Sequence, residues 1–397
     1  MRHTNTNRLR PPKTQEPHFV RKTIRCGIVH LTKIKREILN QEYENLQHFL
    51  QTGNDLGVYS ANKQQAKRFY KRIKPNKEYP VSIRKDLIRI EQRNTKLAKF
   101  WGRIPVKGRR GGVWVAIKPH CEFPAEYEVC ESKLLRKNGR FFLHLTVQKK
   151  VQPNLALYLN SSKLAVIACD IGEANPIASV AWWDGEVQEV VFHASEVRTT
   201  RAHYTHLRKQ IGRRKVKHAL RVVKKIGNKE QRKVRDVLHK ATRKVINKAT
   251  ELRKIGFEPV IVIGDLKNHR TPRRKGTTRC RKNSRKIHSM PSYQVKTQLE
   301  YKALWESIPV LYVNEAYTSQ ICHRCGNKGL RTKRQFKCSC GLDYNADLNG
   351  TRNILTRSLG YILRDRAAVN RPRSPTATKV SDRAQWAMGE APSLGVE

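Results

Sequence analysis

The chain has 397 residues with 82 Lys and Arg against 32 Asp and Glu, which gives a formal net charge of +50. This excess exceeds what solubility requires and predicts a polyanionic partner, because a basic surface attracts nucleic acid over long distances. No apolar run approaches the roughly 18 residues of a membrane span, and no apolar segment follows the basic N-terminus. We therefore expect neither a membrane helix nor a secretory signal, and the scattered cysteines indicate a reducing compartment.

The first part of the chain predicts a β-rich module. Residues 1–16 are polar and basic, which is typical of a segment that stays disordered until it binds. The remaining pattern predicts strands at 23–31, 114–117, 127–130 and 141–147. An Asn138-Gly139 pair predicts a tight hairpin turn before the last of these strands.

A helical insertion is expected between the first two of these strands. Apolar residues recur at helical spacing from Leu39 to Leu50, and Gly53 marks the end of this first helix. A second helix is expected at 82–101. The insertion as a whole is expected at about 32–105.

A new pattern begins after Lys163. Leu164–Cys169 is a fully apolar strand that ends at Asp170, and two further strands at 177–183 and 187–192 are joined by an Asp184-Gly185 turn. Three consecutive antiparallel strands that open with such an aspartate predict a ribonuclease-H-like core. A carboxylate at a buried strand end is costly unless it binds something, so a metal is the simplest explanation for Asp170.

A long basic helical hairpin is expected at 196–255, with its arms separated at Ile226-Gly227-Asn228. In the second arm an apolar stripe lies opposite a basic face, which favours a helix packed on the core and facing phosphates. A fourth strand at 259–263 leads to Asp265 and then to a basic loop that reaches Lys286. The residues expected to bind nucleic acid are Arg235, Lys240, Arg243, Lys244, Arg273, Arg274 and Lys275.

Four cysteines follow a helix at 293–307 and a fifth strand at 310–315. Cys322 and Cys325 form one knuckle, and Cys338 and Cys340 form a second in the less common C-x-C spacing. Thiolates at this spacing can converge on one zinc ion. Because all four ligands are cysteines, no coordination position is left for water, and the zinc is expected to be structural.

Directly after the cysteines, residues 345–354 predict the start of a helix with Asp347 in its first turn. Phosphodiester hydrolysis on a two-metal site needs carboxylates that hold two Mg²⁺ ions about 3.5–4 Å apart. Asp170 and Asp347 are natural ligands for such ions, because both would lie at one edge of a ribonuclease-H-like sheet.

Four motifs together resemble a known family. CDIG (169–172), IGDL (263–266), NEAYTSQICHRCG (314–326) and NADLNGTRNIL (345–355) are similar to those of TnpB, the OrfB proteins of bacterial and archaeal insertion elements. These proteins are relatives of the type V CRISPR nucleases. The resemblance covers roughly residues 17–360 and is most specific in the cysteine segment and NADLNG.

The resemblance implies an α/β multidomain protein: an N-terminal β-barrel-like module with a helical insertion, then a RuvC (ribonuclease-H-like) nuclease domain interrupted by a zinc ribbon. The implied segments are the module at 17–160, the nuclease core at 161–320, the zinc ribbon at 321–341, the last core helix at 342–364 and a disordered tail at 365–397. It further implies a guide RNA and double-stranded target DNA, which is unwound and cut beside a short adjacent motif. We expect the protein to work in the prokaryotic cytoplasm, associated with the nucleoid when on DNA.

One position departs from the family pattern. Most members have a catalytic Glu on the fourth strand, where this chain has Gly264. Adjacent strand residues point to opposite faces, so Asp265 is not an automatic substitute. Glu315 at the end of the neighbouring strand is the favoured third magnesium ligand, with Asp265 and a defective site as alternatives.

Three other functions compete with an RNA-guided DNA endonuclease. An RNA-guided DNA-binding repressor with a decayed nuclease site would explain Gly264 but not the retained Asp170 and Asp347. A DNA transposase lacks its signature, because no Tyr nucleophile occurs with a His-x-His motif. A structural RNA-binding protein would explain the charge but not Asp170 at a buried strand end.

Overall fold

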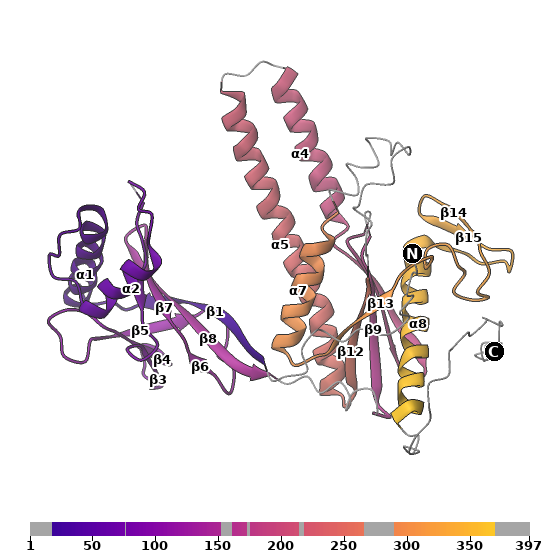
Figure 1. Cartoon of the computed structure of the whole chain (residues 1–397), viewed down its shortest axis with the longest axis horizontal. Coiled ribbons are helices and arrows are strands. Elements are labelled where there is room, and N and C mark those ends of the chain that lie inside the picture. The colour runs from indigo at the N-terminus through magenta and orange to yellow at the C-terminus, as the bar shows by residue number, and fades with distance from the viewer. Residues whose placement is uncertain are drawn as a thin grey trace, which may run out of the picture.

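The computed structural model describes residues 18–75, 77–151, 161–172, 175–213, 218–265 and 290–369. Its described part contains an N-terminal module built on one large sheet and a C-terminal part built on a second sheet (Figure 1). The expectations for residues 1–16, for the basic loop with Arg273, Arg274 and Lys275, and for the tail beyond 369 lie outside the described residues.

The N-terminal sheet has eight strands in the order β2-β7-β8-β1-β5-β4-β3, with β6 paired to β8. Its long central pair is antiparallel, and its other strands are shorter. The strands are β1 (His18–Val29), β2 (Val81–Ile83), β3 (Arg89–Gln92), β4 (Phe100–Ile104), β5 (Val113–Pro119), β6 (Glu128–Val129), β7 (Ser132–Lys137) and β8 (Arg140–Val151). The Asn138-Gly139 turn joins β7 to β8 as expected, and both of its residues have positive φ.

Two helices, α1 (Lys33–Thr52) and α2 (Ser60–Phe69), are inserted between β1 and β2. α1 ends at Gly53, which has the left-handed conformation expected of a C-cap. The helix expected at 82–101 is wrong, because this segment forms β2, β3 and the start of β4. Val81 and Ile83 are fully buried in β2, which pairs with β7, so sheet packing overrides the local helix propensity.

The second sheet has five strands in the order β11-β10-β9-β12-β13. The first three strands form an antiparallel meander, and β12 and β13 run parallel to β9 on its other side. The strands are β9 (Leu164–Asp170), β10 (Ile177–Trp183), β11 (Glu186–His193), β12 (Glu258–Asp265) and β13 (Val310–Asn314). The carboxyl ends of β9, β12 and β13 therefore meet at one edge.

Helices cover both faces of this sheet (Figure 1). α5 (Ala219–Lys254) and α7 (Ser292–Trp305) pack on one face, and α8 (Ala346–Val369) packs on the other. α4 (Glu196–Arg213) and α5 form the expected basic hairpin, which projects beyond the sheet. The expected separation at Gly227 is wrong, because α5 runs through this residue. One glycine inside a helix costs only about 1 kcal/mol.

The cysteine segment forms a small three-stranded sheet between β13 and α8. Its strands are β14 (Leu330–Thr332), β15 (Gln335–Lys337) and β16 (Asp343–Asn345). α8 begins directly after β16 and continues to Val369, a few residues into the segment expected to be disordered. Among the described residues, no helix is long and apolar enough to cross a membrane.

Candidate active site and zinc ribbon

Three carboxylates lie on the α8 side of the second sheet. In β9, Val166 and Ala168 pack toward α8, and Asp170 continues this alternation. In β13, Leu311 and Val313 pack on the same side. Glu315 comes two residues after Val313, so the alternation of a strand places it on this side as well. Asp347 in the first turn of α8 completes the group.

Glu315 occupies the space above Gly264. A Cβ atom added to Gly264 would overlap the Glu315 carboxylate and would also lie 3.0 Å from Ile354 Cδ1. No side chain can therefore stand at position 264 while Glu315 keeps this place. The carboxylate comes from β13 and fills a position over β12 that a residue at 264 would otherwise take.

Asp265 lies on the other side of the sheet. Its neighbour Ile263 packs in the core formed with α5 and α7, and Asp265 has the same parity along β12. Lys296 of α7 forms an ion pair with Asp265 at 3.2 Å. The structure thus groups Glu315, and not Asp265, with the α8 face.

Local contacts fix Asp347 at the start of α8. Asn345 accepts hydrogen bonds from the backbone N–H groups of Asp347 at 2.9 Å and Leu348 at 3.3 Å, as a helix-capping side chain does. Asn175, which follows β9, donates its side-chain amide to Asp347 Oδ2 at 3.0 Å. Arg331 of β14 lies 3.4 Å from Asp347 Oδ1. Sequence reasoning missed both Asn175 and Arg331, because only the fold brings them to this carboxylate.

Asp170 approaches α8 closely because position 350 is a glycine. A Cβ atom on Gly350 would lie 2.9 Å from Asp170 Oδ2, which is closer than real Cβ contacts allow. Gly350 therefore lets the carboxylate at the end of β9 reach the first turns of α8, where Asp347 lies.

The electrostatics of the site reflect crowded, buried acids. Burial, followed by the charge of Asp347, raises the pKa of Asp170 to about 7. Burial, followed by the charge of Asp170, raises the pKa of Glu315 to about 8. The buried Oε2 of Glu315 has no hydrogen-bond partner among the described residues. Arg331 and Lys296 offset only part of these effects, and a divalent cation would supply further positive charge.

The donor set suits magnesium. Hard oxygen ligands from carboxylates are those that Mg²⁺ uses in proteins, usually one or two of them together with water and substrate phosphates. The ligand atoms of the three acids lie further apart than those of the four cysteines. Among the described residues, only the cysteines form a group of three or more His, Cys, Asp or Glu ligand atoms within 4.8 Å of one another.

The four cysteines converge on one point. Their sulfur atoms all lie within 4.8 Å of one another, with Cys322 Sγ 3.7 Å from Cys340 and Cys325 Sγ 3.5 Å from Cys338. Four sulfurs placed about 2.3 Å from a tetrahedral zinc ion would be about 3.8 Å apart, so the group fits zinc. Gly326 and Gly341 follow the two knuckles with positive φ.

Two asparagines of α8 hold the first knuckle. The amide of Asn349 donates to the Ile321 carbonyl at 2.7 Å, and its Oδ1 accepts from the His323 backbone at 3.0 Å. Asn353 donates to the carbonyls of Thr318 and Ile321, both at 2.7 Å. We call Asn349 and Asn353 the asparagine clamp. It joins the four-cysteine segment to the helix that carries Asp347.

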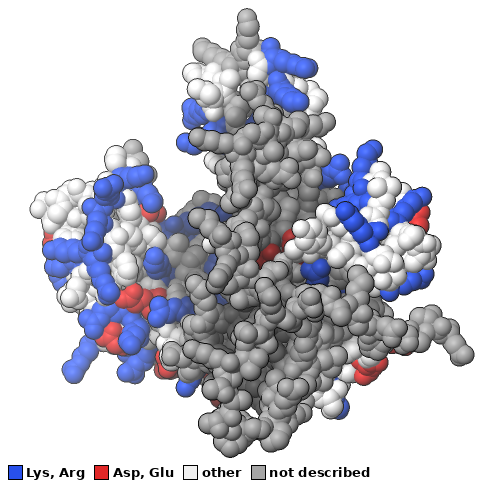
Figure 2. Space-filling view, turned by 45° about the vertical axis from the view of Figure 1, so that its right-hand side comes forward, with Lys and Arg blue, Asp and Glu red and all other residues white. Residues whose placement is uncertain are grey.

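A basic groove of about 980 Å³ lies between β1, α5 and α7. Lys240, Arg243 and Lys244 line it from α5, opposite basic residues of β1 that include Arg21 and Lys22. Arg235 is exposed on α5 outside the residues that line the groove. Figure 2 shows Lys and Arg side chains in separate groups at the left, top and right of this view, with smaller patches of Asp and Glu among them.

Some of these basic side chains already form ion pairs with acidic residues. Lys240 pairs with Asp236 at 2.7 Å and Arg243 with Glu306 at 3.2 Å. Burial, followed by the charge of Arg243, lowers the pKa of the neighbouring Lys302 to about 8. An anion in the groove would relieve this repulsion between cations.

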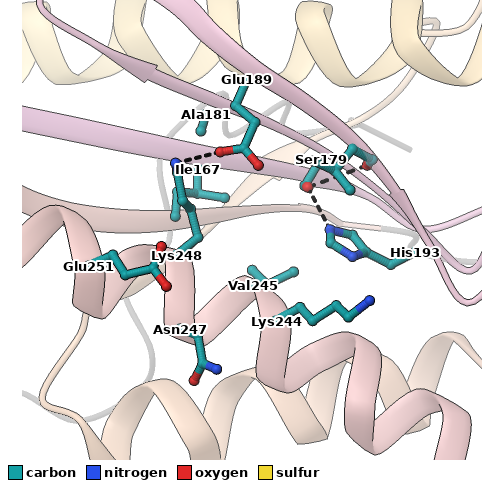
Figure 3. Close-up of a pocket in the computed structure, with 11 residues that line it drawn as sticks. Ile167, Ser179, Ala181, Glu189, His193, Lys244, Val245, Asn247, Lys248 and Glu251 are labelled. Atoms are coloured by element: carbon teal, nitrogen blue, oxygen red, sulfur yellow. Dashed lines mark hydrogen bonds and ion pairs between the residues drawn. The ribbon is translucent and has the colours of Figure 1, made fainter.

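A second cavity, of about 290 Å³, lies between β10, β11 and α5 on the sheet face opposite the acids (Figure 3). Ser179 and His193 are both buried there, 2.9 Å apart from Oγ to Nε2. Lys248 of α5 also lines the cavity and pairs with Glu189, away from Ser179 and His193 (Figure 3). The sequence did not indicate this cavity, and it contains none of the three acids.

Parts of this chain are similar to known proteins. Residues 293–354 match the family model described as Cas12f1-like, TNB domain. A TnpB-like protein of Methanocaldococcus jannaschii is 26% identical over 231 residues, which is 56% of this chain and 80% of that protein. A Cas12f1 chain solved with sgRNA and target DNA aligns over 84% of this chain and 98% of its own length, with 14% identity and a TM-score of 0.35.

Two further relatives match over shorter regions. InsQ of Escherichia coli, which is named as an RNA-guided DNA endonuclease, is 35% identical over 134 residues, or 30% of this chain and 31% of that protein. The CRISPR-associated endodeoxyribonuclease Cas12f1 of Sulfoacidibacillus thermotolerans is 37% identical over 84 residues, 20% of each chain. The chain spans less than a third of the length of both in these matches.

The matched model and the relatives define a class of protein, the TnpB-like and Cas12f-like proteins. Within this class, the matched model and the named relatives support a similarity to the TnpB (OrfB) family.

Proposed function

We propose that this chain is an RNA-guided DNA endonuclease encoded by a transposable element. Guide RNA would pair with target DNA beside a short adjacent motif, and a magnesium-dependent site of the RuvC type would cut the DNA. The observation that carries the proposal is the grouping of Asp170, Glu315 and Asp347 on one face, at the edge where β9, β12 and β13 end. The strand order of this sheet supports a ribonuclease-H-like core.

Asp170, Glu315 and Asp347 would hold two Mg²⁺ ions, which supply an activated water and stabilise the leaving oxygen. The chain's own residues prepare this site. Asn175 occupies one oxygen of Asp347 and so orients the other. Arg331 is partly exposed beside Asp347, where its guanidinium can contact a phosphate oxygen of the substrate.

The basic surfaces would hold the nucleic acids. Lys240, Arg243 and Lys244 line a groove between the two sheets, and phosphates bound there would neutralise closely spaced cations. Arg235 and the basic loop with Arg273, Arg274 and Lys275 are proposed to contribute further phosphate contacts. The four cysteines would hold a structural zinc ion.

The domain boundaries are proposed accordingly: a module at 17–160, a nuclease core at 161–320 and a zinc ribbon at 321–341. The last core helix, expected at 342–364, is α8 and begins at Ala346. The helical insertion was expected at about 32–105, but its two helices span only Lys33–Phe69. A nuclease-inactive repressor stays the alternative, because position 264 lacks the usual acid.

The test is to purify the protein with the RNA that it binds, sequence that RNA, and redesign its variable segment against a chosen DNA. The proposal predicts cleavage of that DNA in Mg²⁺ and none of a mismatched DNA. Guided binding without cleavage would establish the repressor instead. Binding that ignores the guide would contradict both.

A further inference from the structure

Tyr317 combines two properties that are unusual in one residue. Its backbone has φ of +63°, in the left-handed region, and it is the only Phe, Tyr or Trp among the described residues with positive φ. Its side chain is 67% exposed. A bulky residue in this conformation costs free energy, and an exposed ring gains none of it back by burial.

The turn around Tyr317 is held rigidly. Thr318 donates to the Glu315 carbonyl from both its backbone N–H, at 3.1 Å, and its hydroxyl, at 2.9 Å. Arg357 donates to the Ala316 carbonyl at 2.8 Å. The N–H of Ile321 donates to the Tyr317 carbonyl at 3.1 Å. These contacts fix the backbone, so the strained conformation cannot relax.

Nothing among the described residues receives the Tyr317 ring. It has no aromatic or cation–π partner there, and its hydroxyl makes no hydrogen bond. Tyr317 follows Glu315 by two residues, so their Cα atoms are at most about 7 Å apart. A strained, exposed aromatic ring is therefore held within one nucleotide's length of an acid of the candidate active site.

We propose that Tyr317 is a stacking platform for one unpaired nucleobase of the DNA strand beside the bond to be cut. Every base offers a π-face, so an aromatic platform holds a single strand without selecting its sequence. The stack would fix the position of the strand relative to Glu315. This inference rests on the proposed function, because it takes the strand that enters the acid site as its ligand.

The first test measures stacking without cleavage. Single-stranded DNA carrying 2-aminopurine at successive positions is added to the complete protein with its RNA, with Asp347→Asn present to prevent cutting. We expect the emission to be quenched at one or two positions, and equally so with Tyr317→Phe. Tyr317→Ala and Tyr317→Gly should remove this quenching. Equal quenching by the alanine variant would overturn the inference whether or not the protein cuts DNA.

The second test separates function from structure. Tyr317→Gly removes the strain, so it should raise the melting temperature while it lowers cleavage about tenfold through loss of the stack. An abasic nucleotide at the stacking position should slow the unmodified protein equally and should not slow Tyr317→Ala further. Phe69→Ala, an exposed aromatic residue of α2, is the control and should cut normally. A glycine variant that is less stable would show that Tyr317 serves the fold.

Failure of the proposed function looks different from failure of this inference. In the first case, the unmodified protein does not cut intact DNA, and the quenching pattern is still measurable. In the second case, the unmodified protein and Tyr317→Ala cut equally well.

Discussion

Glu315 and Gly264 are complementary: the Glu315 carboxylate fills the space in which a side chain at position 264 would stand. The acid and the glycine come from adjacent parallel strands, β13 and β12. A glycine at 264 is therefore a condition for Glu315 to join Asp170 and Asp347. This relationship supports the proposal that Glu315 takes the place of the acid that β12 lacks.

The first prediction tests this complementarity. Gly264→Ala introduces a Cβ that overlaps the Glu315 carboxylate, and such overpacking typically costs about 1–3 kcal/mol. We expect lower thermal stability and lower cleavage. Combining Gly264→Glu with Glu315→Ala should restore stability relative to Gly264→Glu alone. In the double variant, only one carboxylate has to fit into the shared space. Additive losses in the double variant would contradict the shared space.

The second prediction concerns pH and stability without added divalent metal. The pKa values of Asp170 and Glu315 are raised in the folded protein to about 7 and about 8. Unfolded carboxyl groups ionise near pH 4. Between these values the folded state binds more protons, so the contribution of these groups to stability is complete below about pH 4 and is lost as pH rises toward 8.

Glu315→Gln replaces one of these two titrating carboxyl groups with an amide that stays neutral at every pH. Its melting temperature should exceed that of the unmodified protein at pH 8, by several degrees, and the two should approach each other at pH 5. Thermal denaturation across this range, in buffer without added Mg²⁺, measures the difference. Parallel curves at all pH values would show that Glu315 is not held in its neutral form.

The third prediction concerns the asparagine clamp. Asn349→Ala leaves the Ile321 carbonyl with one donor fewer and the His323 N–H without its acceptor. A buried group left without its partner costs about 1–3 kcal/mol, and the ribbon would no longer fix α8. We expect reduced stability and cleavage reduced at least tenfold, with RNA affinity unchanged. Thr356→Ala, at an exposed position of the same helix, is the control and should behave normally.

Zinc removal should have the same consequence. Cys322→Ser breaks the knuckle that the clamp grips, so folding and cleavage should fall together. A variant that lost bound zinc but kept its melting temperature would contradict a structural role for the metal.

Much of the core followed from local patterns. Leu164–Cys169 is apolar throughout because both faces of β9 are covered by helices, and this made the strand and Asp170 visible. The cysteine spacing indicated the zinc site, and the sulfur atoms do converge. Alternation along β12 was enough to argue that Asp265 points away from Gly264.

Other features depend on contacts that no local pattern contains. The segment at 82–101 is rich in helix-forming residues, yet pairing of Val81 with Leu134 makes its beginning a strand. Asn175 reaches Asp347 across 172 positions of the chain. Arg331 lies within the four-cysteine segment of the sequence, and only the folded structure brings it to Asp347.

The fourth prediction concerns salt. Lys240, Arg243 and Lys244 line a groove with many other cations, so phosphate contacts should dominate the affinity for nucleic acid. Each neutralised phosphate adds about 0.7–0.9 to the slope of log affinity against log salt concentration. We expect a steep slope, and Lys244→Gln should reduce it by about one unit. A slope near zero would mean that base contacts dominate.

The most direct test of the account compares cleavage by four single variants, each supplied with guide RNA and matched target DNA in Mg²⁺. Asp170→Asn, Glu315→Gln and Asp347→Asn should each reduce the cleavage rate by orders of magnitude, because each removes charge from the metal site, while RNA binding persists. Asp265→Asn should cut nearly normally, since Asp265 pairs with Lys296 on the other face of the sheet. Normal cleavage by Glu315→Gln together with an inactive Asp265→Asn would contradict the account.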